Sequence, residues 1–403
     1  MFHGWKVVAA AFVVALFGWG LGFYGPGIYL AALTETRDWD IAAIASAITF
    51  YYLVGATITI YAGDLFERFG PRIVVTAGAV AMTVGVTGLA AVSAPWMVFA
   101  AFLVMGLGWA CMGGAAINLI VAPWFERKRG LAISLALNGA SCGGVVIAPV
   151  LIFLIAQFGF TGGMRIAAAG MLILLLPPVW LWVHRRPDDL GLLPDGRPAS
   201  ASAGGHIPPT PPLRRASLFG RLNFWSISVP FALGLMAQVG FLTHQAAYLG
   251  PPLGAGGAAL AISITTAAAV VGRLAMGLFV DAVDKRLAAC GNFVLQTFAI
   301  GLMLLYPDPT LLYVYCALFG LGVGNMITFP PLIVQAEFPT AHFGRIVSLI
   351  LAINQYTFAF GPGLLGWLRD LSGGYDAALI ACLALLITAA ASVLIRSPVT
   401  AAA

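Results

Sequence analysis

Twelve apolar runs, each long enough to cross a lipid bilayer, follow one another along this chain of 403 residues. A helix of about 20 apolar residues spans the ~30 Å hydrocarbon core of a membrane. The runs are bounded by charged residues or by Gly and Pro, and they lie at 6–33, 41–62, 73–93, 96–122, 130–157, 165–183, 224–249, 258–280, 287–306, 311–334, 345–368 and 377–395. This pattern predicts an all-α integral membrane protein with twelve transmembrane helices.

The shortage of charged residues leads to the same prediction. Only 9% of the residues are charged and 61% are apolar. A soluble domain carries roughly 25% charged residues, so most of this surface has to face lipid. The first apolar stretch continues from Val7 to Leu33, which is too long for the core of a cleaved signal peptide. We therefore expect it to be the first span.

A polar stretch from His184 to Arg221 separates the first six runs from the last six. It contains PASASAGGHIPPTPPLRRAS, a composition that is too polar to bury a core. The sequence therefore predicts an N-terminal six-helix bundle at 1–183, a flexible cytoplasmic linker at 184–223 and a C-terminal six-helix bundle at 224–403.

The two sets of runs share repeated motifs. Gly63 to Arg72 follows the second run, and Gly277 to Arg286 follows the eighth at an offset of 214 residues. Both read Gly, three residues, an acid, and then Arg five residues further on. Gly139-x3-Gly143 in the fifth run likewise has a counterpart in Gly361–Pro362–Gly363 of the eleventh. Internal duplication is typical of membrane transporters, whose substrate site lies between the repeats.

The basic residues predict how the chain is oriented. If the N-terminus and the even-to-odd loops face the cytoplasm, sixteen of the 20 basic residues are inside, Arg37, Arg165 and Arg369 are outside, and Arg273 lies within a run. Such an excess marks the cytoplasmic side and assigns both termini to it. It also accounts for the net charge of +5 without a nucleic-acid partner. We expect a multi-pass protein of the plasma membrane, the inner membrane in a bacterium.

Enzymatic and metal-binding functions find little support. The cysteines form no C-x-x-C pair or other metal spacing, and they are Cys111, Cys142, Cys290, Cys316 and Cys382. The interiors of the runs hold one histidine, one arginine and no acid, whereas an active site needs a cluster of such groups. We predict no catalytic residue, no metal and no cofactor.

Arg273 is the residue that most constrains function. It lies eight residues before Asp281, which marks the cytoplasmic end of the eighth run, so it sits ~12 Å deep in the membrane. Burying an arginine there costs about 2.5–3.5 kcal/mol and calls for a partner. A substrate carboxylate fits the two-pronged geometry of the guanidinium. The alternative is that Arg273 binds helix-end carbonyls or extends to the inner surface.

The charge count predicts a monoanion, because a dianion would keep one unpaired charge at low dielectric. Ser263 and Thr266 share a helical face with Arg273, which indicates a polar stripe along a cavity. The alternative for both hydroxyls is a hydrogen bond to the preceding turn of their own helix.

His244 is the one histidine inside a run and the candidate proton carrier, since imidazole titrates near neutral pH. It lies about 20 residues, or ~30 Å, from the inner end of its run, so we expect no direct contact with Arg273. An outer-gate hydrogen bond is the alternative, and the proton could also travel on the substrate carboxylate.

Further polar side chains inside the runs could line the cavity. The alternative for each is an interhelical hydrogen bond. They are Tyr24, Asn118, Asn138, Gln238, Gln245, Tyr248, Asn325, Asn354, Gln355 and Tyr356.

The repeat, the central linker and the Gly63–Arg72 loop together resemble the major facilitator superfamily. Glu67 stands where that family usually has an aspartate, so the charge is kept. Four segments are similar to its bacterial monocarboxylate and oxalate:formate carriers. They are Gly4–Trp5, the 123–132 loop PWFERKRGLA, the 191–196 segment GLLPDG, and Gly272–Arg273.

The resemblance implies two pseudo-symmetric six-helix halves that rock around a central cavity lined by the first, fourth, seventh and tenth helices. It assigns the substrate carboxylate to Arg273 and favours Tyr24, Asn118 and Asn325 as cavity residues. Mammalian carriers have an aspartate where Ala269 stands and a lysine in the first span, where this chain offers only Lys6. Oxalate carriers add a lysine in the eleventh span, and here that span has none. These departures argue against a mammalian-type proton mechanism and against a dianion.

The family's charged loops latch its halves together in the outward-open state. The corresponding residues here are Glu67, Arg68, Arg72, Asp281, Arg286 and Arg127. Their alternative role is to set the orientation of the chain in the membrane.

The sequence as a whole predicts a secondary active transporter of a small organic anion, a monocarboxylate above all. We expect alternating access, coupled to protons or run as exchange, by a protein that acts as a monomer in the lipid bilayer. The expected substrate-binding residues are Arg273, Tyr24, Asn118, Asn325, Thr266, Gln245 and Tyr356. The alternative is an efflux carrier for neutral or amphipathic compounds, in which Arg273→Ala would leave transport intact.

Overall fold

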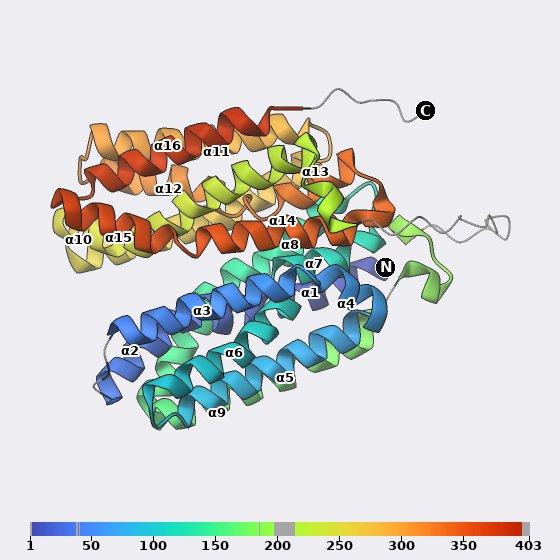
Figure 1. Ribbon diagram of the computed structural model, residues 1–403, viewed down its shortest axis with the longest axis horizontal. Helices are drawn as coiled ribbons and strands as arrows, with labels where there is room; N and C mark the ends of the chain where they lie inside the picture. The colour runs from blue at the N-terminus through green and yellow to red at the C-terminus, as the bar shows by residue number, and fades with distance from the viewer. Residues whose placement is uncertain (1, 38, 40, 185, 197–213, 397–403) are drawn as a thin grey trace. The chain divides into compact units, whose positions relative to one another are not determined.

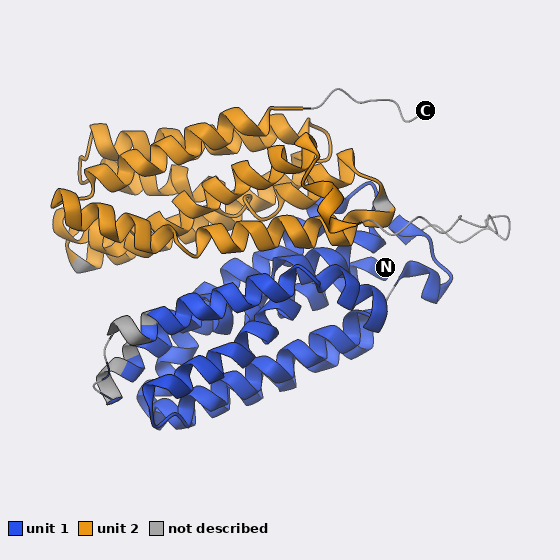
Figure 2. Cartoon of the chain, in the orientation of Figure 1, with its two compact units in different colours: residues 1–209 blue, residues 210–403 orange. Residues whose placement is uncertain are grey.

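The computed structural model describes residues 2–37, 39, 41–184, 186–196 and 214–396, and every regular element assigned in these ranges is a helix (Figure 1). The chain forms two compact units, Met1–Pro209 and Thr210–Ala403 (Figure 2). The division between them falls inside the predicted linker.

Unit 1 contains nine α-helices joined by short turns of π and 3-10 helix in its described part. They are α1 Gly4–Trp19, α2 Gly25–Arg37, α3 Ile41–Thr59, α4 Ala62–Phe69, α5 Pro71–Ala90, α6 Pro95–Met112, α7 Gly114–Val121, α8 Arg129–Cys142 and α9 Ala148–Trp182. The π turns are η1 Gly20–Tyr24, between α1 and α2, and η3 Gly143–Ile147, between α8 and α9.

Unit 2 contains seven α-helices in its described part. They are α10 Leu222–Phe279, α11 Lys285–Leu305, α12 Leu311–Val323, α13 Phe329–Glu337, α14 Phe343–Phe358, α15 Gly361–Ser372 and α16 Asp376–Val393.

The helices account for all twelve predicted spans. Within the described ranges, nine helical stretches are long and apolar enough to cross a membrane, and the pair Ser46–Thr59 and Ala62–Phe69, bent by 55°, makes a tenth. One of the nine, Arg129–Trp182, holds two predicted runs in its 54 residues. The remaining span consists of α12 and α13 together, on either side of Gly324–Thr328. The predicted all-α membrane fold is confirmed.

Two glycines divide the longest helical stretches. Gly159 in α9 and Gly254 in α10 both have φ of 69°, a left-handed conformation that only glycine adopts readily. At Gly254 the prolines Pro251 and Pro252 come just before the break. The chain therefore turns where the sequence predicts loops, between 157 and 165 and between 249 and 258.

Glycines also bring helices into close contact within each unit. In unit 1 a methyl group on Gly143 would lie 2.6 Å from the carbonyl oxygen of Leu16 in α1. In unit 2 a methyl group on Gly361 would meet the carbonyl oxygen of Met236 in α10. Small residues allow such backbone contact between membrane helices. Gly143 and Gly361 belong to the repeated glycine motif, and both face the first helix of their own unit.

The start of the predicted linker is attached to unit 1. Asp195, with φ of 62°, turns its carboxylate toward the loop after α7, where it accepts hydrogen bonds from the backbone N–H groups of Glu126 (3.3 Å) and Arg127 (3.1 Å). Gly191 and Gly196, in the same GLLPDG segment, also have positive φ. Residues 197–213, for which the sequence predicts flexibility, lie outside the described residues.

Candidate functional site

Arg273 is buried in the second half of α10, with 3% of its surface exposed. Its Nε donates a hydrogen bond of 2.8 Å to the carbonyl oxygen of Gly324, the C-cap residue that follows α12. Glycine is needed there, because a methyl group on Gly324 would lie 2.6 Å from the Ala269 carbonyl oxygen and 2.9 Å from the Arg273 side chain. This contact is a helix-end bond of the kind that the alternative interpretation named, and it engages one of the five guanidinium donors.

A cluster of buried amides lies on the neighbouring helices of unit 2. Asn325 donates to Oδ1 of Asn292 (3.0 Å), and Asn292 donates to the carbonyl oxygen of Gly322 (3.1 Å). Gln296 donates to Oε1 of Gln238 (3.3 Å). Asn325, predicted to line the cavity, therefore takes part in an interhelical amide network, the alternative function considered for it. Within the described residues its Oδ1 has no hydrogen-bond partner.

The other polar residues predicted in α10 also have partners inside the unit. Gln245 is buried and donates to Oγ1 of Thr265 (2.7 Å), which joins the two halves of α10. Thr266 and Ser263 donate to Ile262 and Ala259 in their own helix. Both hydroxyls therefore make the hydrogen bond to the preceding turn of their own helix, which was the alternative to a cavity-lining role.

His244 joins α10 to the last helices of unit 2. Its Nε2 lies 3.0 Å from the carbonyl oxygen of Pro362, and its Nδ1 lies 3.2 Å from the hydroxyl of Tyr375. A carbonyl only accepts, so Nε2 carries a proton, whereas the tyrosine hydroxyl can either donate to Nδ1 or accept from it. The two contacts are hydrogen bonds of the kind that the outer-gate alternative named, and the role of His244 as a proton carrier stays a prediction.

Asn354 in α14 is a polar residue with an unusual environment. It is 1% exposed, and within the described residues neither its Oδ1 nor its Nδ2 has a hydrogen-bond partner. A buried amide without a partner costs free energy, which makes it a candidate for ligand contact. Tyr356, two residues further on, is half-buried.

Unit 1 holds the two remaining predicted substrate-binding residues. Tyr24 ends the π turn η1, and its ring lies where a methyl group on Gly144 of η3 would be. Asn118 is buried in α7 and donates to Gly114 in its own helix (2.8 Å). The two π turns contact each other, and such turns occur frequently at functional sites.

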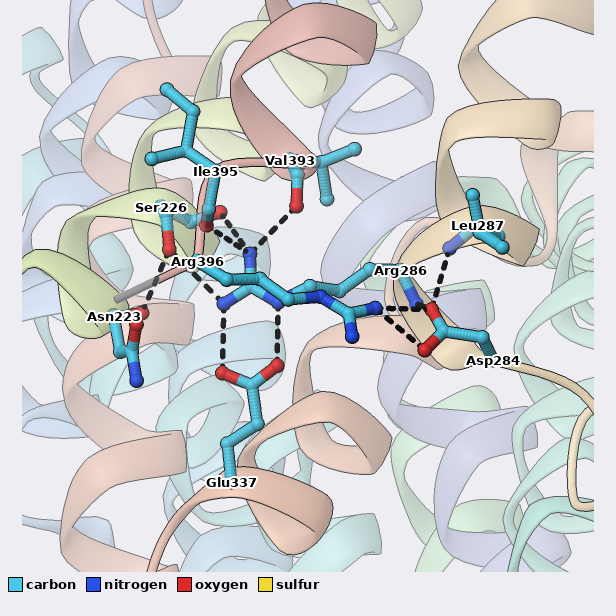
Figure 3. A network of polar contacts seen from close by, with 9 residues as sticks. All are labelled: Asn223, Ser226, Asp284, Arg286, Leu287, Glu337, Val393, Ile395 and Arg396. Carbon is cyan, nitrogen blue, oxygen red and sulfur yellow. Dashed lines mark hydrogen bonds and ion pairs between the residues drawn. The ribbon is translucent and has the colours of Figure 1, made fainter. Parts of the chain in front are cut away.

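Arg286, predicted as a latch residue, is the centre of a polar network inside unit 2 (Figure 3). It is 1% exposed, and its Nε and Nη2 bind Glu337 of α13 at 2.5 and 2.8 Å in two-pronged geometry. Its Nη1 donates to the carbonyl oxygens of Val393 (2.6 Å), the last residue of α16, and of Ile395 (3.0 Å), just beyond that helix. Ser226 of α10 accepts from both terminal nitrogens. These contacts hold four helices of one unit together.

Arg72 has a related position in unit 1, as the repeat predicts. Its Nε donates to the carbonyl oxygen of Val183 at the end of α9 (2.5 Å), and its Nη2 donates to Nε2 of His184 (3.1 Å). Both repeat arginines therefore bind the end of the last helix of their unit. The other predicted latch residues are exposed and lie in α4 (Glu67, Arg68), in the loop after α7 (Arg127) and in the turn after α10 (Asp281).

Asp284 accepts the backbone N–H groups of Arg286 and Leu287 at the start of α11, both at 3.0 Å. Arg396 binds both oxygens of the same carboxylate, at 2.6 and 2.5 Å (Figure 3). The hydrogen bond from Arg396 is the main reason why the pKa of Asp284 lies below its ordinary value. The sequence interpretation missed Asp284, Glu337 and Arg396 as partners. The signal available for Glu337 was an acid three residues beyond an apolar run.

Comparison with known proteins identifies the family. A model of the Major Facilitator Superfamily matches residues 10–362. Mouse monocarboxylate transporter 11 is 29% identical over 94% of this chain and 84% of its own length, and the human protein is 27% identical over 94% and 79%. MFS-type transporter 1 of the fungus Ophiocordyceps is 28% identical over 83% of this chain and 71% of its own.

The fold comparison agrees. The crystal structure of the E. coli fucose:proton symporter superposes with a TM-score of 0.69 at 14% identity, covering 97% of this chain and 100% of the other. At that identity the likeness concerns the fold alone. The match to the family model covers most of the chain, which confirms the predicted resemblance. The chain belongs to the major facilitator superfamily and is a multi-pass membrane transporter.

Proposed function

We propose that the protein is a secondary active transporter of a small monocarboxylate that works by alternating access. The observation that carries the proposal is Arg273, a guanidinium buried in a membrane helix. A carboxylate is the ligand that a guanidinium binds best, and a single arginine neutralises a single negative charge. The names of the mammalian relatives, monocarboxylate transporters 11 and 12, support the same class of cargo.

In this proposal Arg273 binds the carboxylate, and the contact of its Nε with Gly324 fixes the plane of the guanidinium. The other substrate-binding residues of the proposal stay sequence-based predictions, Asn325, Gln245, Thr266 and Tyr356 in unit 2 and Tyr24 and Asn118 in unit 1. The protein acts as a monomer in the plasma membrane, with both termini in the cytoplasm. Transport is coupled to protons or runs as exchange, and His244 is the candidate proton carrier.

Counterflow in proteoliposomes, with labelled monocarboxylates and dicarboxylates, tests the cargo. We expect monocarboxylates to exchange and Arg273→Gln to weaken their apparent affinity by about 10- to 100-fold, the loss of one charge-assisted hydrogen-bonded pair. Arg369→Gln is the matched control, since Arg369 is exposed and pairs with Asp370. Preference for dicarboxylates would contradict the charge argument.

An efflux carrier for neutral or amphipathic compounds is the second candidate. It is favoured by the helix-end contact of Arg273, which is also what a structural arginine would make. In that case Arg273→Gln would leave transport intact and would lower the thermal stability of the protein. Measuring counterflow and thermal unfolding on the same preparation of the variant separates the two functions.

His244→Gln tests proton coupling. Glutamine can donate to the Pro362 carbonyl and accept from Tyr375, so it preserves both contacts without titrating. If His244 carries the proton, accumulation driven by a pH gradient is lost while counterflow continues. Unchanged accumulation would exclude His244 from the proton path.

A further inference from the structure

Two histidines and an arginine meet at the end of α9 in unit 1. We call His3, Arg72 and His184 the histidine cluster. The ring centroids of His3 and His184 lie 5.1 Å apart, and Nη2 of Arg72 lies 3.1 Å from Nε2 of His184. The carbonyl oxygen of Trp182 lies 2.8 Å from Nε2 of His3 and 3.4 Å from Nδ1 of His184. The cluster thus joins the start of the chain, α5 and the end of α9.

The hydrogen bonds fix the protonation state of His184. Arginine only donates, so Nε2 of His184 accepts from Arg72 and carries no proton. The proton of the neutral ring is then on Nδ1, which faces the Trp182 carbonyl. A second proton on Nε2 would replace this acceptor by a donor and place a cation directly against the guanidinium.

The charged and titratable groups around His184 favour the neutral ring on balance. Burial is the main cause that lowers the pKa of His184, and Arg72 from α5 and His3 from the segment before α1 act in the same direction. Asp189 of the following turn and the backbone contact with Trp182 oppose it. With the pKa below its ordinary 6.5, the contact is complete above that pH and is lost as the pH falls through the lowered value.

We propose that His184 is a regulatory proton-binding site whose protonation breaks its contact with Arg72 and so loosens the end of α9, which the Arg72–Val183 bond continues to hold. The positive-inside distribution assigns this end of unit 1 to the cytoplasm, so the site senses cytoplasmic acidification. Loss of this contact also loosens the N-terminal segment, which His3 attaches to Trp182, and the start of the 186–196 segment, which follows His184.

Unit 2 supplies an internal contrast. Arg286, the repeat counterpart of Arg72, also binds the end of its last helix, but the side chain that faces it is the Glu337 carboxylate. Carboxylates as a class lose their charge in a more acidic range than imidazoles gain theirs. Among the contacts described for Arg286 there is no imidazole, so the proposed response belongs to the Arg72 contact of unit 1.

Hydrogen exchange of the purified full-length protein in lipid nanodiscs, at pH 7.5 and 5.5, tests the proposal. Rates are divided by the intrinsic exchange rates, and the reporters are the amides of Val183, Gly191 and Leu192, which are hydrogen-bonded to Val179, Asp188 and Pro187. We expect their protection to fall at pH 5.5. The largest possible fall is about tenfold for each unit of difference between the pKa of His184 in the released form and its pKa in the bound form. The amides at the end of α16 serve as the reference and keep their protection.

His184→Gln should remove the pH response, because glutamine accepts from Arg72 and donates to Trp182 at every pH. His342→Gln, in the 3-10 turn before α14, is the matched control and should respond as the native protein does. Should His184→Gln fold poorly, Arg72→Gln decides, since without the guanidinium a protonated His184 meets no repulsion. Equal protection at both pH values in the native protein, or a native-like response in His184→Gln or Arg72→Gln, would overturn the proposal.

Discussion

Arg286 and Arg273, both buried in unit 2, illustrate different uses of one side chain. Arg286 has a carboxylate in two-pronged geometry and three backbone carbonyl acceptors, so its charge is compensated within the protein. Arg273 donates from its Nε to the helix-end carbonyl of Gly324. A buried charge needs compensation, and the contacts of Arg286 supply it for a structural role.

The Arg286–Glu337 pair yields a stability prediction. Breaking a buried pair leaves an uncompensated charge, so Glu337→Leu or Arg286→Met should each lower the free energy of unfolding by about 3–5 kcal/mol. The double variant should lose much less than the sum of the two. Denaturant unfolding of the protein in detergent measures all three, and additive losses would contradict the pairing.

Asp284 gives a prediction that separates two contacts. Asparagine caps a helix as well as aspartate does, so Asp284→Asn should be nearly neutral, whereas Asp284→Ala should cost about 1 kcal/mol. Its pKa lies below the ordinary 3.8, so the carboxylate contributes stability above that pH and loses it only as the pH falls through the lowered value. The cap should therefore be unchanged from pH 5 to 8 in thermal unfolding. A large loss in Asp284→Asn would instead assign the stability to the Arg396 contact.

At the scale of elements, close contact between α10 and α12 positions the candidate site. A methyl group on Gly272 would meet the Leu321 carbonyl oxygen, and one on Gly320 would meet the Thr265 carbonyl oxygen. The two helices therefore touch backbone to backbone beside Arg273. This contact brings the Gly324 carbonyl within reach of the guanidinium.

Gly272→Ala tests this packing. The added methyl group forces the backbones apart, so we expect a loss of about 1–3 kcal/mol in unfolding free energy together with weaker monocarboxylate binding. Gly291→Ala is the matched control, because Gly291 lies in α11 with no atom near its missing Cβ. There alanine should be neutral or stabilise by up to about 1 kcal/mol. Equal effects of both substitutions would contradict the close approach.

The sequence predicts the spans well because the membrane thickness sets their length and composition. Prolines in the sequence mark further kinks, and the two π turns and the break between α12 and α13 end just before Pro26, Pro149 and Pro330. The sequence does not predict the 55° bend between α3 and α4, which depends on contacts between helices. For the same reason the sequence indicates Arg273 as important, while the partner Gly324, 51 residues away, becomes visible only in the structure.

At the scale of the whole molecule, the internal repeat is visible both in the sequence and in the structure. The offset of 214 residues relates Arg72 to Arg286, and both bind the end of the last helix in their unit. Their acceptors, Val183 and Val393, are backbone carbonyls, which any residue provides. The sequence therefore predicts the pair of arginines and not what they bind.

The orientation in the membrane is also a property of the whole chain. Sixteen basic residues on one predicted side against three on the other should keep both termini in the cytoplasm. In bacterial expression, a fluorescent protein fused after the C-terminus should be fluorescent, and an alkaline phosphatase fusion there should be inactive. The opposite pair of results would reverse the proposed orientation.

The attachment of Asp195 to the loop after α7 has a mechanical consequence. Tension in the chain beyond Gly196 is transmitted to the backbone of Glu126 and Arg127 instead of to the last turn of α9. After a protease cut between 197 and 213, the 186–196 segment should therefore stay bound to unit 1 through Asp195.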